Sequence, residues 1–299
     1  MEDQPVLHAL YRDGAIQEAV DPAPTRGCFS ASCSACQAES LARNDPQVDL
    51  GMVAEATPSA TSSLRRLRRV TDVSVLQADP ELAAEVPANE RSRAVRASRA
   101  PVLVLSLGKW QFETAPERTS LGALILVGMV VLRMEFGGYG HLEVLGKGDV
   151  LNPWSLGTET TLQEQVSVNV MQSGCMALLD RHFALQMTPW PEVFAALMRR
   201  QIMRTRRMVV QASILSCSRV DDRLELMLWR LAEQFGSMTR EGLLVRLPFT
   251  HQQLAEMIAA RRSTVSLAVS RLVAEDRLRR PGRNQWLLPN HELTRLTAS

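Results

Sequence analysis

The sequence predicts an α+β chain in which an antiparallel β-domain precedes a long helix and a winged helix-turn-helix domain. Three observations carry this prediction. Short apolar runs at roughly 10-residue spacing, separated by glycine turns, occupy residues 96–188. A helical apolar seam follows in 189–216, and residues 217–292 hold two short helices before a basic hairpin. Residues 1–95 lack a persistent periodic pattern and are expected to be poorly ordered.

The β-domain is predicted as a sandwich or roll because its apolar runs are short and are bounded by turn residues. Glycine-containing turns are expected at 137–140, at 146–149 and at Gly174. Apolar and polar side chains alternate over 166–170, as they do in a strand with one solvated face. The runs expected to form strands are 102–105, 124–127, 130–134, 141–145, 166–170 and 176–179.

From Pro191 the apolar spacing becomes helical, and a proline in the first turn is a helix-start signal. Six positions spaced alternately by three and four residues form a seam of nearly three heptads. Such a seam on a long helix favours a homodimer formed along 189–216. The alternative is a helix that packs on its own domain. The seam positions are Ala195, Met198, Ile202, Thr205, Val209 and Ala212.

Residues 250–275 carry the strongest local pattern, that of a helix-turn-helix. Thr250 can cap a helix over 251–258, and a second helix follows from 262 or 263 to about 275. Its apolar stripe consists of Val265, Ala268, Val269 and Leu272. Arginine and hydroxyl side chains near a helix N-terminus suit phosphate contacts and base-edge reading. The candidate DNA-contacting side chains of this helix are Arg261, Arg262, Ser263, Thr264, Ser266, Ser270 and Arg271.

A basic hairpin follows the second helix. Two short apolar strands in 277–288 flank a Pro-Gly turn, and this β-wing is placed to lie along a phosphate backbone. Its candidate phosphate contacts are Arg279, Arg280 and Arg283. The charge distribution agrees, because the whole chain has a net charge of +2 whereas residues 191–299 alone have +8. Double-stranded DNA is therefore the predicted partner.

Two segments resemble the CRP/FNR-type bacterial transcription regulators. Residues 247–266, LPFTHQQLAEMIAARRSTVS, resemble the winged-helix segment of that family. Residues 142–151, LEVLGKGDVL, resemble its cyclic-nucleotide-binding-like β-roll, and the order of domains matches over about 96–290. The resemblance implies a homodimer on a near-palindromic operator, with RNA polymerase as a further partner. It also implies that Arg262 reads guanine and that Thr264 contacts a phosphate.

The sequence departs from the family pattern at three positions of the helix-turn-helix. Ser263 stands where many members have glutamate, and Leu267 stands where many have a second arginine. The half-site is therefore expected to differ from the best-known one. Ala259 stands at the usual turn glycine, where a positive φ would penalise a β-carbon.

The sequence indicates the signal to which the protein responds less clearly than it indicates DNA binding. Family members that bind cyclic nucleotide cradle its phosphate with a Gly-Glu-Leu run and an Arg-Ser pair. Here residues 150–166 contain no arginine, and Glu159 and Glu164 would repel a phosphate. The sequence therefore predicts no cyclic nucleotide in the roll, leaving another small molecule around Trp154, or no ligand at all.

The cysteines offer an alternative signal. Cys28, Cys33 and Cys36 have the spacing C-x4-C-x2-C, which suggests thiolate ligands in a reducing compartment. Cys175 resembles the β-roll ligand of the family's iron–sulfur branch, which implies a [4Fe–4S] cluster. A zinc site and unligated thiols are the alternatives for the same residues. Cys217 is expected to be a buried thiol.

Other functional classes fit the sequence less well. It contains no phosphate-binding glycine loop, no G-x-S-x-G elbow and no H-E-x-x-H, so we expect no enzyme. A metal- or redox-binding protein whose winged helix serves protein contacts is the alternative, and the basic wing speaks against it. The longest apolar run, 121–132, is too short to span a bilayer, and the N-terminus has no signal-peptide pattern. A cytoplasmic location is therefore expected, without a membrane partner.

Overall fold

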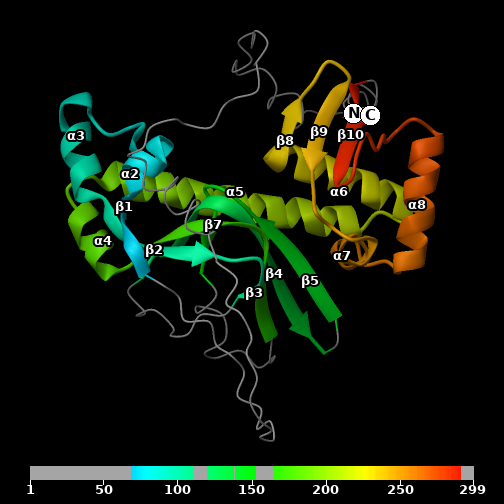
Figure 1. Ribbon diagram of the computed structural model, residues 1–299, viewed down its shortest axis with the longest axis horizontal. Coiled ribbons are helices and arrows are strands. Elements are labelled where there is room, and N and C mark those ends of the chain that lie inside the picture. The colour runs from blue at the N-terminus through cyan, green and yellow to red at the C-terminus, as the bar shows by residue number, and fades with distance from the viewer. Residues whose placement is uncertain (1–68, 111–119, 138, 153–164, 291–299) are drawn as a thin grey trace, which may run out of the picture. The chain divides into compact units, whose positions relative to one another are not determined.

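The chain folds into two compact units that meet in sequence between Ser213 and Ile214. The computed structural model describes residues 69–110, 120–137, 139–152 and 165–290 (Figure 1). We call the described residues up to Ser213 the N-terminal unit and those from Ile214 the C-terminal unit. Each unit combines helices with an antiparallel sheet, so the predicted α+β class is confirmed.

The N-terminal unit is built on a seven-stranded antiparallel sheet with the order β1-β2-β7-β4-β5. Two short strands lie off this path, since β3 pairs with β7 and β6 pairs with β4. The interior of the roll holds apolar side chains such as Leu105, Ile125, Leu145 and Met176. The strands are β1 (Arg69–Ser74), β2 (Arg99–Leu105), β3 (Gly108–Trp110), β4 (Gly122–Phe136), β5 (Tyr139–Leu145), β6 (Val150–Leu151) and β7 (Gln165–Leu179).

The two longest strands were each predicted as two separate strands, and this prediction was wrong. β4 and β7 run for 15 residues each and pair along most of their length. Gly128 has a φ of 110°, and the register of the pair shifts around it. A β-carbon on Gly174 would overlap the Val127 carbonyl oxygen. Both glycines therefore serve irregularities within continuous strands, and Gly174 makes no turn.

The described part of the segment expected to be poorly ordered, residues 69–95, is folded. It contributes β1, α2 (Val75–Ala78), the short 3-10 helix η1 (Pro80–Ala83) and most of α3 (Ala88–Ala97). Leu76 and Leu82 are buried in the same core cluster as Phe183 of a later helix. These pieces are short and irregular in sequence, so burial against the rest of the unit stabilises them. The N-terminal unit therefore begins before residue 96.

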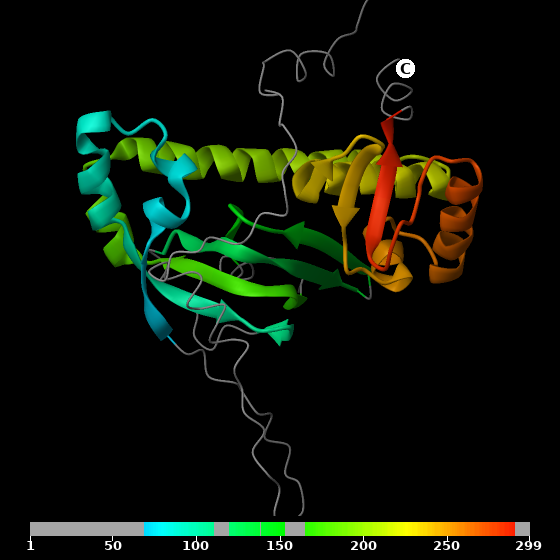
Figure 2. The same cartoon turned by 45° about the horizontal axis from the view of Figure 1, so that its top comes forward.

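Two helices follow the sheet, α4 (Arg181–Met187) and the long α5 (Pro191–Leu215). Figure 2 shows α5 running alongside the strands of its own unit. Val193, Ala196 and Leu197 on its inner face are buried in the core.

Three arginines further along the same face of α5 bind the carboxylates of acidic residues that are buried in the unit. Charge-assisted contacts to buried carboxylates hold both partners in a defined geometry. The inner face of α5 is thus fixed by apolar packing near its start and by ion pairs along its middle. The three pairs are Arg200–Asp79, Arg204–Glu143 and Arg207–Asp149.

The C-terminal unit packs a helix, α6, between a three-stranded sheet and the helix-turn-helix (Figure 1). The sheet has the order β10-β9-β8 and is antiparallel. Among the described residues, no helix is long and apolar enough to span a membrane. The elements are α6 (Val220–Phe235), β8 (Gly236–Met238), β9 (Gly242–Arg246), α7 (His251–Met257), α8 (Arg262–Ala274) and β10 (Gln285–Pro289).

Candidate nucleic-acid interface

The helix-turn-helix forms as its sequence predicts. Thr250 caps α7 through a capping box, in which the Gln253 N–H donates to Thr250 Oγ1 at 3.2 Å and the Thr250 N–H donates to Gln253 Oε1 at 2.9 Å. The turn to α8 passes through Ala259, whose φ is +49°. Arg223 of α6 donates to the carbonyl oxygens of Ile258 and Ala259, at 2.9 and 3.3 Å. The turn is thus held by α6 as well as by its own hydrogen bonds.

One side of α8 is locked into the core, and the other is left open. All four residues of the predicted apolar stripe, from Val265 to Leu272, are buried. Arg261, Arg262 and Ser263 at the N-terminal end are exposed, whereas Thr264 is half-buried. No residue in the described first turn of α8 is acidic. The end of the helix with the positive dipole therefore presents two arginines to solvent, an arrangement that favours anions.

The serines of α8 are partly engaged within the helix-turn-helix. Ser266 Oγ donates to the Arg262 carbonyl oxygen at 3.1 Å, and Ser270 Oγ donates to the Ser266 carbonyl oxygen at 3.1 Å. His251 Nδ1 of α7 also lies 2.9 Å from Ser266 Oγ. No sequence pattern singles out His251, because its partner is 15 residues away along the chain.

The environment of His251 is cationic. Partial burial and the positive charges of Arg280 and Arg262 lower the pKa of His251 below its usual 6.5. Both arginines belong to the set predicted to contact DNA, one on α8 and the other on the wing. His251 is therefore a further residue of this surface, placed where the field of the two arginines is felt.

Arg271 is used within the C-terminal unit itself. Its Nη2 donates to Asp221 Oδ1 of α6 at 2.7 Å, and the Asp221 side chain is only 9% exposed. A charge that neutralises a buried carboxylate is less available to a phosphate. Arg271 is thus a residue predicted to contact DNA whose charge the fold itself already uses.

The wing contains one regular strand, whereas the sequence predicted two. Its second arm is β10, but its first arm reduces to a single bridge between Arg279 and Leu287. Arg279 forms hydrogen bonds at 2.6 and 2.8 Å to the exposed carboxylate of Asp276. Arg280 stacks over the Trp286 ring at 4.2 Å from its centroid, and Arg283 is exposed at the turn. The three arginines are therefore displayed on a short hairpin.

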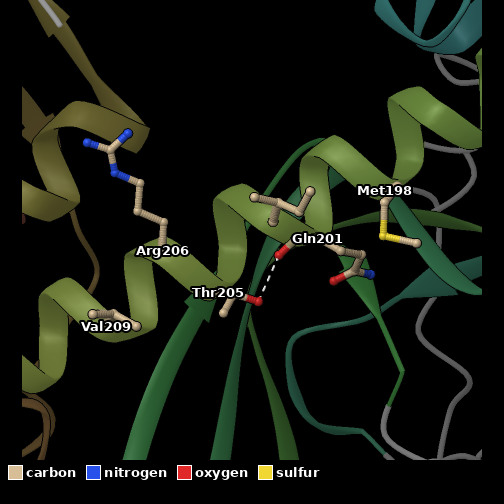
Figure 3. Close-up of a pocket in the computed structure, with 6 residues that line it drawn as sticks. Met198, Gln201, Thr205, Arg206 and Val209 are labelled. Atoms are coloured by element: carbon tan, nitrogen blue, oxygen red, sulfur yellow. Dashed lines mark hydrogen bonds between the residues drawn. The ribbon is translucent and has the colours of Figure 1, made fainter. Parts of the chain in front are cut away.

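The outer face of α5 is apolar and open. All six seam positions are exposed, with Met198, Ile202 and Val209 at 61%, 59% and 61%. Four of them, Met198, Ile202, Thr205 and Val209, line a hollow of about 420 Å³ on the helix surface together with Gln201 and Arg206 (Figure 3). The face that carries the predicted seam is thus the face that the N-terminal unit leaves uncovered.

The cysteines proposed as metal ligands are only partly described. Cys28, Cys33 and Cys36 lie outside the described residues, and those that are described contain no group of three or more potential ligands. Cys175 is 3% exposed within an apolar core cluster of the sheet. The thiol of Cys175 is therefore not accessible from the surface in this conformation. Cys217, expected to be buried, is half-exposed.

Comparison with known proteins agrees with this architecture. Residues 222–295 match the model of the Crp-like helix-turn-helix domain. A CooA mutant from Carboxydothermus hydrogenoformans has a TM-score of 0.54 at 16% identity, covering 78% of this chain and 98% of that one. A cyclic nucleotide-binding domain containing protein from Listeria monocytogenes has a TM-score of 0.53 at 18% identity, covering 62% and 87%.

The c-di-GMP responsive global regulator CLP from Xanthomonas campestris has a TM-score of 0.50 at 17% identity, covering 68% of this chain and 100% of that one. No curated protein matches the sequence. At these identities the solved structures establish the fold, and the domain model independently identifies the C-terminal unit. The chain therefore has the fold that these CRP/FNR-type structures share, and its residues 222–295 match the Crp-like helix-turn-helix domain.

Proposed function

We propose that this protein is a sequence-specific DNA-binding transcription regulator that acts as a homodimer on a near-palindromic operator. The carrying observation is the N-terminal end of α8, where Arg261, Arg262 and Ser263 are exposed while the opposite side of the helix is locked in the core. A recognition helix needs this combination of a rigid mount and an open polar end. RNA polymerase is the further partner that this function implies.

The proposed contacts divide into base reading and backbone positioning. Arg262, at the first position of α8, can donate two hydrogen bonds to O6 and N7 of a guanine in the major groove. Thr264 and the N–H groups at the start of α8 are placed for phosphates. Arg280 and Arg283 of the wing supply further phosphate contacts, whereas Arg279 must share its charge with Asp276.

Replacement of Arg262 tests the base-reading role. Binding sites are selected from randomised duplexes with the full chain, and affinities are then measured by gel-shift titration. Arg262→Ala should cost about 1–3 kcal/mol on the selected site and relax preference at one base position. The matched change Arg283→Ala should weaken binding to all sequences alike and reduce the salt slope by about one. Unchanged selectivity of Arg262→Ala would show that α8 is not the reading helix.

The dimer is proposed along α5. The exposed seam gives each copy three large apolar side chains to bury, Met198, Ile202 and Val209. Burial of such a side chain contributes about 1.5–3 kcal/mol. A parallel pair of α5 helices would present two recognition helices to successive major grooves, about one DNA turn apart.

The signal is a separate proposal. Cys28, Cys33 and Cys36 supply a thiolate set suited to an iron–sulfur cluster, and Cys175, whose thiol is buried in the structure, is the proposed fourth ligand. Anaerobic purification followed by iron analysis and a visible spectrum tests it. Iron together with a charge-transfer absorption band supports the cluster, zinc alone supports a structural site, and protein free of both metals refutes metal sensing by these residues.

A further inference from the structure

Leu267 is a large apolar side chain in the middle of the surface that α8 would turn toward DNA. It is 62% exposed and lies on the side of the helix opposite the buried Ala268 and Val265. Ser263 stands one turn before it and Ser270 about one turn after it, on the same face. Single exposed leucines are common on protein surfaces, so the exposure alone decides nothing. The neighbouring side chains make this leucine informative.

The side chains around Leu267 offer little competition for a base edge. Ser266 and Ser270 donate their hydroxyl protons to carbonyl oxygens of α8 itself, at 3.1 Å in both cases. Serines are also short, so the leucine projects beyond them. The nearest long cationic side chain on the same helix, Arg271, is bound to Asp221. In the middle of the exposed face of α8, the Leu267 side chain therefore extends further toward solvent than the short polar side chains around it.

We propose that Leu267 selects a thymine by packing on its C5-methyl group in the major groove. This inference rests on the proposed function. The thymine methyl is the apolar group that the four standard bases show in that groove. A leucine pressed against the donors and acceptors of the other bases would leave them desolvated and unpaired. Leucine thus favours thymine in two ways. It packs on the methyl group, and it leaves the polar edges of the other bases without hydrogen-bond partners.

The position of the thymine follows from the helix. Leu267 is five residues beyond Arg262, which corresponds to about 7.5 Å along the axis of α8. Base pairs are stacked about 3.4 Å apart. The selected thymine should therefore lie within about two or three base pairs of the base that Arg262 reads, in the same half-site.

The test removes the methyl group without changing base pairing. The full chain first selects a site from randomised duplexes, and each thymine of the half-site is then replaced in turn by deoxyuridine. At one position the wild type should lose about fourfold in affinity, the amount expected for one buried methyl group. The Leu267→Ala protein should bind thymine and deoxyuridine duplexes equally at that position. Val273→Ala, which alters another exposed apolar residue on the flank of α8, should keep the wild-type discrimination.

The outcomes separate this inference from the proposed function. If the wild type selects a site but ignores deoxyuridine at every position, Leu267 does not read a methyl group although the protein still reads DNA. If Leu267→Ala keeps the discrimination, another residue makes the contact. If the wild type selects no sequence at all, the proposed function itself fails. Circular dichroism of each variant confirms that the fold is retained.

Discussion

Ala259 holds a left-handed backbone conformation, with φ at +49°, in the turn between α7 and α8. The left-handed region costs a residue with a β-carbon about 1–2 kcal/mol, whereas glycine adopts it freely. Ala259 is exposed, so its methyl group adds little packing. The hydrogen bonds from Arg223 to Ile258 and Ala259 keep the turn in place despite this strain.

Relief of the strain is measurable. Ala259→Gly should stabilise the protein by about 0.5–1 kcal/mol, because the strain removed exceeds the added entropy of glycine in the unfolded chain. The neighbouring change Ala260→Gly is the control, and it should destabilise the protein since Ala260 has no positive φ. Denaturant unfolding of both variants gives the comparison. Equal destabilisation by the two substitutions would mean that residue 259 is unstrained.

His251 gives the C-terminal unit a pH dependence of definite sign. Its pKa is lowered in the folded protein by burial and by Arg280 and Arg262, so the unfolded chain takes up a proton first as the pH falls. Stability should therefore be unaffected well above 6.5 and should decrease as the pH falls from 6.5 through the lowered pKa. His251→Gln should remove this part of the acid sensitivity. Identical pH profiles of unfolding free energy for the two proteins would rule out the effect.

At the scale of the element, two arginines of α5 form ion pairs that differ in burial. Arg204 lies over Glu143 with two hydrogen bonds of 2.7 Å, and the Glu143 side chain is 6% exposed. Burial lowers the pKa of Arg204, but the hydrogen bonds and the charge of Glu143 raise that pKa by a larger amount. The net shift is upward, so the guanidinium stays charged. Arg199 pairs with Glu85 at 2.9 Å, but both side chains are more than half exposed.

The two pairs should respond differently to mutation. Arg204→Met leaves a carboxylate buried and unpaired, which should cost about 3–5 kcal/mol. The double variant with Glu143→Leu should recover much of this loss. Arg199→Ala, the control in the same helix, should change the unfolding free energy by less than about 1 kcal/mol. Similar effects of the two arginine substitutions would contradict the assigned burial.

The elements that could be predicted from sequence are those with a local signal. α7 and α8 carry their own caps and apolar stripes, so the prediction agreed with the structure to within a residue or two. The pieces in 69–97 carry no such signal, because the contact of Leu76 and Leu82 with residues a hundred positions later stabilises them. The break assumed at Gly174 failed because glycine also occurs in strands where two backbones approach closely.

The same distinction applies to the candidate site. The exposure of Arg262 follows from the helical pattern alone. The engagement of Arg271 does not, since Asp221 is 50 residues earlier in the chain. Residues whose role depends on a distant partner are those that sequence patterns misassign.

At the scale of the whole molecule, the near-neutral net charge of +2 is an average over unlike parts. Residues 191–299 carry a net charge of +8, and the helix-turn-helix and wing display several of those arginines. A protein that is close to neutral overall can thus present a strongly positive end to a polyanion. If the protein binds DNA as proposed, the acidic remainder should reduce its nonspecific attraction to nucleic acid.

The proposed homodimer can be tested on the whole chain. Ile202→Glu places a charge at the centre of the exposed seam and should convert a dimer into a monomer in sedimentation equilibrium. Met203→Glu is the matched control, since Met203 is 48% exposed but lies about a quarter of a turn away from the seam. It should leave the dimer intact. A monomeric wild type, or a dimer that tolerates Ile202→Glu, would exclude α5 as the interface.

The arginines on the inner face of α5 have a mechanical consequence. Arg200, Arg204 and Arg207 lie along one line of the helix and reach carboxylates at the junction of α2 and η1, on β5 and on the turn before β6. Three anchors on one line resist rotation of the helix about its own axis more than they resist bending. A movement of the turn that contains Asp149 would therefore rotate α5 about its own axis. The exposed seam would change its direction while the helix stayed straight.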